Sequence, residues 1–265
     1  ITGLGHLFIS SSLKTKILRF ILKPLYRILF KSKRSYIIFQ NFEDKKYLTK
    51  IGLTNNKKSF LIKGSGINID HFKTSKTKKD SFQSPIKLLF PSRIIKEKGI
   101  CEVLKAFNSL IRRGEKIELI IAGDIDNGNK SSLNNKELSL LRNDPNIKLL
   151  GHVDEMREVY ENSDIIILPS WREGLSRSLI EAAAMQKPII TSNVPGCREI
   201  IDHGYSGLII PAKDSKSLEL AILLLIRNQN LAFYFAKNTR RKVIKEFEVN
   251  LINEETIKHY EYLFK

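Results

Sequence analysis

The sequence predicts an α/β protein with one complete Rossmann-like domain, built on a parallel sheet, plus the tail of a second Rossmann-like domain. Two features predict this architecture. Between residues 86 and 212, short apolar runs alternate with helical stretches, which is typical of a parallel sheet covered by helices on both faces. Before residue 73 the same alternation supplies only two short strands, which are too few to close a sheet.

The N-terminal part contains a basic apolar segment, a strand, a helix and a second strand. We expect the strands at Ser35–Phe39 and Ser59–Ile62 and the helix at Phe42–Ile51. The second strand runs into the sequence Gly64-Ser65-Gly66. Residues 73–84 are polar and rich in Lys, Ser and Thr, so they are expected to form a linker.

Six strands and five intervening helices are predicted for the complete domain. The strands are expected at Ile86–Phe90, Ile117–Ala122, Ile147–Leu150, Asp164–Leu168, Pro188–Thr191 and Gly207–Ile210. The helices are expected near Ile100–Arg113, Asn134–Arg142, Asp154–Asn162, Arg177–Met185 and Gly196–Asp202. In such sheets ligands bind in the crevice at the carboxyl ends of the strands, so the loops there are the candidate site.

The residues after Asp214 predict amphipathic helices that follow the sheet. One apolar face is formed by Leu218, Ala221, Ile222, Leu225 and Ile226. A last helix is expected near Asn250–Leu263. We therefore divide the chain into the remnant of a first domain (1–75), the complete domain (76–245) and a helix that crosses back to the first domain (246–265).

The charge distribution indicates an anionic partner. The net charge is +17, and Ile1–Arg34 holds eight Lys or Arg residues and no acid, interleaved with apolar residues. Leu13–Arg34 is therefore typical of a helix on an anionic membrane surface. An ordinary helix with one face in a core explains the pattern equally well, because the apolar arc is broad and interrupted by Pro24. No run is long and apolar enough to predict a membrane-spanning helix.

Several classes of protein are disfavoured by the sequence. No recognition motif or aromatic platform accompanies the lysines, so we expect no nucleic-acid partner. Cys101 and Cys197 form no disulfide framework, which suits a cytoplasmic protein, and the five histidines lack metal-ligand spacing. No Gly-x-Gly-x-x-Gly follows a predicted strand, so a dinucleotide-dependent oxidoreductase is not expected.

The loop after the fourth strand of the complete domain carries the first group of candidate residues. Pro169 to Ala182 runs from a strand through Gly174 directly into a helix, whose free N–H groups can bind an anion. Gly174 allows a phosphate to approach the backbone closely. Glu173 and Glu181 can face one cleft, although a lone pair of glutamates at this spacing is more often solvated surface.

The loop after the first strand of the same domain carries two cations. Arg93 and Lys98 lie in Pro91–Gly99, at the mouth of the predicted sheet, where they could clamp a diphosphate with charge-assisted hydrogen bonds. A solvated basic loop is the alternative for either residue alone. The combination of a cation pair and a helix N-terminus at neighbouring strand ends favours a phosphate site.

These residues resemble the family 4 retaining glycosyltransferases of the GT-B fold. The resemblance rests on Pro169–Glu181 with its Glu-x7-Glu pair, on Ser92-Arg93-x4-Lys98-Gly99, and on Pro195–Glu199 and Gly207–Pro211. Residues 1–5 and 64–70 further resemble a bacterial subgroup that adds sugars to polyprenyl-diphosphate-linked acceptors. Ser176 replaces a frequent Pro of the family, and Lys63 a frequent Asn.

The resemblance implies a role for each candidate residue. Arg93 and Lys98 would neutralise the diphosphate of a UDP-sugar donor, without a metal or other cofactor. Glu173 would bind the transferred sugar and stabilise positive charge during bond cleavage, and Glu181 would bind the ribose. The distal phosphate would meet backbone N–H groups, those of Gly174, Leu175 and Ser176.

The resemblance also implies a place and an acceptor for the reaction. The acceptor would be a polyprenyl-diphosphate-linked saccharide, so the enzyme would work in the cytoplasm on the inner face of the plasma membrane. In the family the acceptor binds mainly to the first domain, of which this sequence matches only the tail. The alternative function is therefore a nucleotide-binding remnant that lacks its acceptor half and has no activity of its own.

Overall fold

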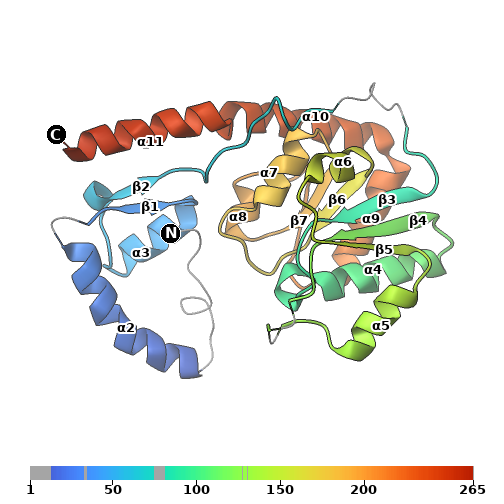
Figure 1. The fold of residues 1–265 in the computed structure, drawn as a ribbon, viewed down its shortest axis with the longest axis horizontal. Helices are drawn as coiled ribbons and strands as arrows, with labels where there is room; N and C mark the ends of the chain where they lie inside the picture. The colour runs from blue at the N-terminus through green and yellow to red at the C-terminus, as the bar shows by residue number, and fades with distance from the viewer. Residues whose placement is uncertain (1–12, 33–34, 75–80, 127, 130, 265) are drawn as a thin grey trace.

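The described part of the chain forms two parallel sheets, one of six strands and one of two. The computed structural model describes residues 13–32, 35–74, 81–126, 128–129 and 131–264. Predictions that concern residues 1–12, Lys33, Arg34 and residues 75–80 of the linker lie outside this range. Figure 1 shows the larger sheet with its helices at one end of the molecule and the smaller sheet at the other.

The six-stranded sheet has the order β5-β4-β3-β6-β7-β8, and every neighbouring pair is parallel. Its strands are β3 (Ile86–Phe90), β4 (Ile117–Ala122), β5 (Ile147–Gly151), β6 (Ile165–Leu168), β7 (Ile189–Ser192) and β8 (Leu208–Ile210). This order is the doubly wound Rossmann arrangement, in which the strand order reverses between the first and fourth strands. All six strands lie where the sequence predicts them.

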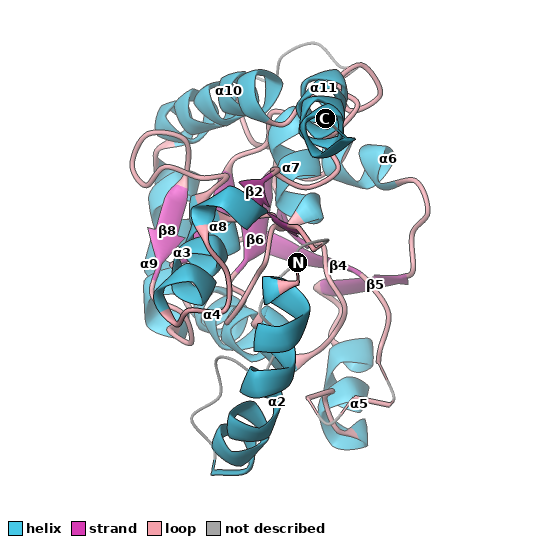
Figure 2. Cartoon of the chain, turned by 90° about the vertical axis from the view of Figure 1, so that its left-hand side faces the viewer, coloured by secondary structure: helices cyan, strands magenta, loops and turns pink. Residues whose placement is uncertain are grey.

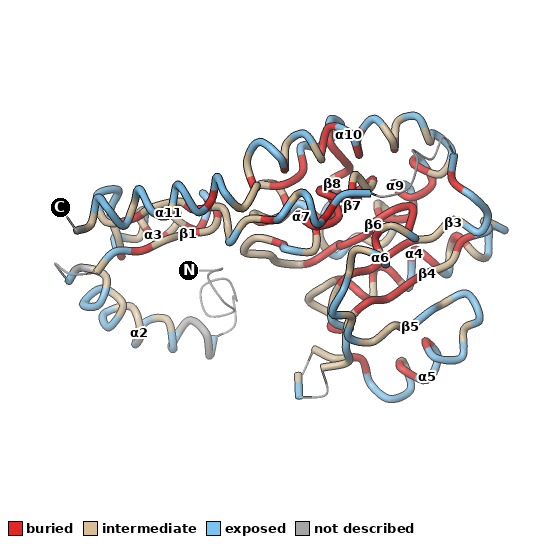
Figure 3. The backbone as a smooth tube through the Cα atoms, turned by 45° about the horizontal axis from the view of Figure 1, so that its top comes forward, coloured by how far each residue is buried: buried red, intermediate tan, exposed pale blue. Residues whose placement is uncertain are grey.

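Helices cover both faces of this sheet (Figure 2). They are α4 (Ile100–Arg112), α5 (Asn135–Asn143), α6 (Met156–Glu161), α7 (Arg177–Ala184), α8 (Pro195–Arg198), α9 (Ser215–Arg227) and α10 (Gln229–Glu246). Because the strands are enclosed, all four residues of β6 are buried, and the sheet runs through the buried interior in Figure 3. The burial explains why these strands are apolar throughout rather than alternating.

Two helices are shorter than the sequence predicts. The Glu155 carboxylate accepts a hydrogen bond from the Arg157 N–H and caps α6, so Asp154 lies before the helix. Helix α8 ends at Arg198, whereas the prediction extended to Asp202. There the chain enters a turn in which the Ser206 N–H bonds the Asp202 carbonyl. Such ends depend on single capping contacts, which apolar periodicity does not report.

The N-terminal part contains α2 (Leu13–Lys31), β1 (Ile37–Phe39), α3 (Phe42–Lys50) and β2 (Ser59–Leu61), with β1 and β2 paired in parallel. Ile37, Phe39, Leu48 and Leu53 form a small separate core. Tyr26 and Phe30 attach α2 to this core. Pro24 lies inside α2 and does not end it, although an interior proline removes one backbone hydrogen bond and crowds the preceding turn.

Most of the apolar surface of α2 is not covered. Phe20 is 82% exposed and Ile28 is 71% exposed. Figure 3 shows most of the helix as exposed or intermediate, in contrast to the interior of the large sheet. No helix within the described ranges combines the length and apolarity that crossing a bilayer requires.

The chain passes between the two sheets twice, at neighbouring positions. On the first passage the Ile67 N–H donates to the Phe247 carbonyl at 2.8 Å, and on the second the Val249 N–H donates to the Ile67 carbonyl at 3.0 Å. Helix α11 (Val249–Phe264) then extends over the small sheet (Figure 1), where His259 lies 4.3 Å from Phe60, ring centre to ring centre. The crossing helix predicted from the sequence thus contacts β2.

Candidate functional site

The candidate site lies where the strand order of the large sheet reverses. The loops after β3 and β6 leave the sheet at this point and carry Arg93, Lys98 and Glu173. Gly99 allows the two loops to touch, since a Cβ there would lie 2.3 Å from the Pro169 carbonyl oxygen. The Trp171 N–H also donates to the Glu97 carbonyl at 2.8 Å. The two loops therefore form one structural unit.

Lys98 and Glu173 form an ion pair between these loops. The Lys98 Nζ donates to the Glu173 Oε1 at 2.6 Å, and the Ser170 hydroxyl donates to the same oxygen at 2.8 Å. The Glu173 side chain is only 8% exposed. A carboxylate held this way is fixed in direction, and Lys98 compensates its charge. The sequence predicted both residues but not their direct contact.

Arg93 occupies a different ion pair. Its Nη1 donates to the Asp126 Oδ2 at 2.6 Å, and its side chain is 57% exposed. The two predicted cations thus lie on one loop but contact different carboxylates. A diphosphate that drew Arg93 toward Lys98 would compete with Asp126, a residue that the sequence analysis did not single out.

The N-terminus of α7 follows Glu173 after three residues. Ser176 is the N-cap residue and is buried, and its hydroxyl lies 3.2 Å from that of Ser178. Within the described ranges, no acceptor bonds the N–H groups of Gly174, Leu175 or Ser176. Three backbone donors and the positive end of the helix dipole therefore remain available to an anion.

Glu181 is held by two partners, one on its own helix α7 and one on α6. The Arg177 Nε donates to Oε1 at 2.9 Å, and the Tyr160 hydroxyl lies 3.1 Å from Oε2. Burial raises the pKa of Tyr160 well above its ordinary value, and the negative charge of Glu181 adds to the effect. The Arg177 partner follows from the spacing of four residues along a helix. Tyr160, 21 residues earlier, gave no signal in the sequence.

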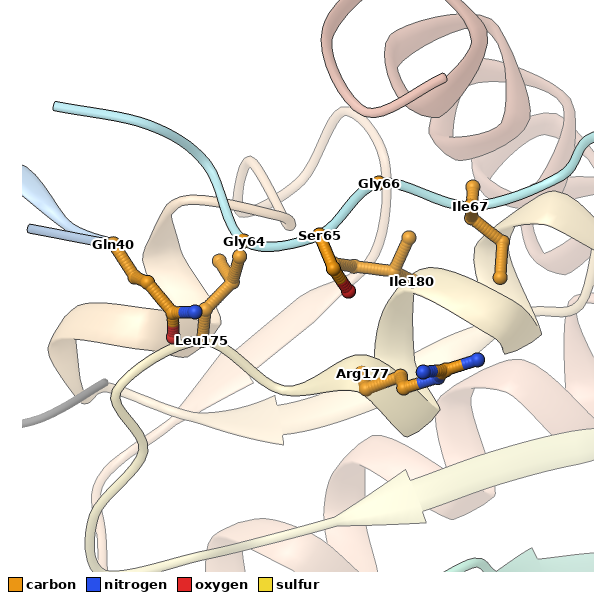
Figure 4. Close-up of a pocket in the computed structure, with 8 residues that line it drawn as sticks. All are labelled: Gln40, Gly64, Ser65, Gly66, Ile67, Leu175, Arg177 and Ile180. Carbon is orange, nitrogen blue, oxygen red and sulfur yellow. The ribbon is translucent and has the colours of Figure 1, made fainter. Parts of the chain in front are cut away.

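Glu181 lines an open cavity of about 710 Å³. The cavity lies between helix α7 and two other segments, the first chain passage near Ser65–Phe72 and the segment from Val153 to Met156. A smaller pocket of about 60 Å³ adjoins it, and Figure 4 shows Ser65 and Arg177 reaching into the space beneath the Gly64–Ile67 passage. The first passage thus forms a wall of the site.

The buried cysteine at this site is not a nucleophile. Burial raises the pKa of the Cys197 thiol to about 12, and the negative charge of Glu173 contributes in the same direction. The thiol therefore stays protonated at neutral pH. Cys101 lies elsewhere, on α4, and its pKa is also raised by burial. Neither cysteine offers a reactive thiolate.

Comparison with known proteins assigns the family. Residues 71–242 match the sequence profile described as glycosyl transferases group 1. The chain belongs to this family. A Campylobacter jejuni N,N'-diacetylbacillosaminyl-diphospho-undecaprenol alpha-1,3-N-acetylgalactosaminyltransferase is 29% identical over 275 residues, which cover 100% of this chain and 70% of the relative.

Solved glycosyltransferases share the fold. The sucrose-phosphate synthase of Thermosynechococcus elongatus has a TM-score of 0.81 and 20% identity, over 99% of this chain and 66% of that one. Anabaena HepE in complex with UDP and glucose has a TM-score of 0.77 and 19% identity, over 91% of this chain and 67% of that one. The chain of this group 1 glycosyltransferase has the GT-B type of fold that the sequence predicts.

Proposed function

We propose that the protein is a retaining glycosyltransferase that transfers a hexose or N-acetylhexosamine from a UDP-sugar to a polyprenyl-diphosphate-linked saccharide. The observation that carries the proposal is the Lys98–Glu173 pair beside the free N–H groups that precede α7, in a chain of the group 1 family. The acceptor class is inferred from the Campylobacter relative, whose name specifies an undecaprenol-linked substrate. The donor class is inferred from HepE, which was solved with UDP.

The donor diphosphate would lie across the two switch-point loops. The N–H groups of Gly174, Leu175 and Ser176 bind the distal phosphate, and Lys98 lies within reach of both this phosphate and Glu173. Arg93 leaves Asp126 to approach the diphosphate. As the bond between the sugar C1 and the phosphate oxygen breaks, negative charge accumulates on that oxygen, and these donors stabilise it. The cations make a metal unnecessary, so a chelator is expected to leave transfer unchanged.

The two glutamates would serve different ends of the donor. Glu173, fixed by Lys98 and Ser170, accepts hydrogen bonds from the sugar hydroxyls and stabilises the positive charge that develops at C1. Glu181 faces the larger cavity and accepts from the ribose hydroxyls. The cavity beside it has room for the base, which supports a position of the nucleoside between α7 and the first chain passage.

Calorimetric titration of the chain with UDP, UDP-N-acetylhexosamines, GDP and NAD, without metal, tests the donor site. Saturable binding of UDP is expected, with a loss of about tenfold or more in Arg93→Ala, because a charge-assisted contact to phosphate disappears. Absence of binding by all four ligands would overturn the proposal. Sugar transfer by this chain alone would exclude the alternative of an inactive nucleotide-binding remnant.

We also propose that α2 lies on the anionic cytoplasmic face of the plasma membrane. Its exposed apolar residues alternate with basic ones such as Lys23 and Arg27, a combination that favours binding at the lipid headgroup level. Such contact would bring the enzyme to a lipid-linked acceptor. Sedimentation with anionic vesicles tests it, and equal sedimentation with neutral vesicles would contradict the electrostatic part.

A further inference from the structure

A buried amide of the N-terminal part contacts the predicted phosphate loop. Asn41 has no exposed surface, and its Nδ2 donates to the Gly174 carbonyl at 2.9 Å, across 133 positions of the chain. Gly174 follows Glu173 directly and precedes the N-terminus of α7. The contact therefore joins the small sheet to the loop on which the proposed donor site depends.

The orientation of the Asn41 amide is fixed by its other contacts. Its Oδ1 accepts from the Asp44 N–H at 2.8 Å and caps α3, while Nδ2 also donates to the Asp44 Oδ2 at 2.9 Å. The amide thus meets one donor and two acceptors, a set that only this orientation satisfies. One hydrogen of Nδ2 is directed at Asp44 and the other at Gly174.

The hydrogen bond to Gly174 determines where the next N–H points. In a planar trans peptide the carbonyl and the N–H lie on opposite sides, so a Gly174 carbonyl held by Asn41 turns the Leu175 N–H away from Asn41. Without a support, glycine leaves this peptide free to adopt several orientations. A single side chain can therefore decide whether the Leu175 N–H is available at the start of α7.

Gly196 supports the same loop from α8. Its N–H lies 3.3 Å from the Glu173 carbonyl oxygen, and a Cβ at this position would lie 2.5 Å from the Gly174 carbonyl oxygen. Nearby, the Phe42 N–H donates to the Glu199 Oε1 at 3.0 Å. The contact between α3 and α8 thus encloses the Gly174 peptide from two sides.

We propose that Asn41 is a positioning residue that directs the Leu175 N–H at the distal phosphate of the donor. The inference rests on the proposed donor site. It also implies that donor binding depends on the placement of the N-terminal part, because Asn41 belongs to that part. Asn41 does not touch the donor and acts through the Gly174–Leu175 peptide.

The test is calorimetric titration of Asn41→Ser with UDP and with UMP. Serine is a good N-cap residue, so the substitution keeps the cap of α3 and removes the donor to Gly174. UDP affinity is expected to fall about fivefold to tenfold, because one hydrogen bond to the phosphate is misaligned. UMP affinity is expected to stay within twofold, because UMP has no distal phosphate.

A matched variant and a second perturbation complete the experiment. Asn134 caps α5, away from the Gly174 loop, in the same way, so Asn134→Ser is expected to leave both affinities unchanged.

Gly196→Ala would push on the Gly174 carbonyl from the other side and should weaken UDP but not UMP, even if Asn41→Ser fails to fold. The inference would be overturned if Asn41→Ser and Gly196→Ala each weakened UDP and UMP equally, or if neither variant weakened UDP. Absence of UDP binding by the unsubstituted chain would instead refute the proposed donor site.

Discussion

Helices α4 and α2 both carry apolar side chains along their length, but α4 buries most of them and α2 leaves most of them exposed. In α4, Val103 and Phe107 are fully buried between the sheet and its neighbours. In α2, Phe20 and Ile21 are 82% and 62% exposed. The difference shows that an apolar pattern identifies a helix face that can be buried. Whether the face is buried depends on which other elements pack against it. The same contrast separates the region of the proposed nucleotide site from the helix that we propose lies on a membrane.

The largest expected difference concerns stability. Phe107→Ala removes a fully buried ring and is expected to lower the free energy of unfolding by about 3–5 kcal/mol. Phe20→Ala removes an exposed ring and should change it by less than about 0.5 kcal/mol. Urea unfolding of both variants measures the two values. A cost above about 2 kcal/mol for Phe20→Ala would mean that α2 is covered by protein in solution.

A substitution in the proposed site should affect sugar transfer without affecting the membrane binding proposed for α2. Glu173→Gln keeps the shape of the side chain but removes the charge that we propose stabilises the transition state. We expect transfer to slow by about a hundredfold to a thousandfold while vesicle binding is unchanged. Radiolabelled sugar transfer and vesicle sedimentation measure the two effects. Transfer within tenfold of the unsubstituted enzyme would remove Glu173 from the catalytic site.

Charge reversal in α2 is the converse experiment. The double variant Lys23→Glu and Arg27→Glu should weaken binding to anionic vesicles by about 30-fold, at about 1 kcal/mol per basic residue. UDP affinity should not change. Lys105→Glu with Arg112→Glu on α4 alters the net charge equally and serves as the control. Equal weakening by both double variants would show that net charge, not α2, attracts the protein to the membrane.

The smallest effect is expected at the buried support of Glu181. Tyr160→Phe removes a hydroxyl that lies 3.1 Å from the carboxylate and should cost about 1 kcal/mol of unfolding free energy at neutral pH. Because the pKa of Tyr160 is raised in the folded protein, the unfolded chain releases this proton first as the pH rises. The unsubstituted protein should therefore lose stability above about pH 10, the ordinary range of tyrosine. Tyr160→Phe should lose less stability over the same pH range. Parallel profiles of stability against pH for the two proteins would contradict the burial of Tyr160.

The sequence predicted the large sheet well because its strands are buried on both faces. Continuous apolar runs such as Ile165–Leu168 cannot be accommodated on a solvated surface, and their regular alternation with helices determines the parallel arrangement. The loops that carry Lys98 and Glu173 followed from the rule that ligands bind at strand carboxyl ends. Helix ends were less predictable, because they depend on single caps such as Glu155.

The contacts that complete the site could not be predicted from the sequence. Asn41 meets Gly174 across 133 positions, and Asp126 meets Arg93 across 33. Such pairs arise only when the fold brings the segments together, and a polar residue in a loop carries no local sign of its distant partner. Arg177 is the exception, since its partner Glu181 lies one helical turn away.

The paired passages between the sheets hold the two parts of the chain together. Hydrogen bonds join Ile67 to Phe247 and Val249, and Gly66 packs so closely that a Cβ would lie 2.6 Å from the Val249 Cα. The pairing is an isolated parallel bridge between Ile67 and Glu248. It joins the two passages at a point separate from the Asn41–Gly174 contact, so the N-terminal part is tied to the large sheet at more than one place.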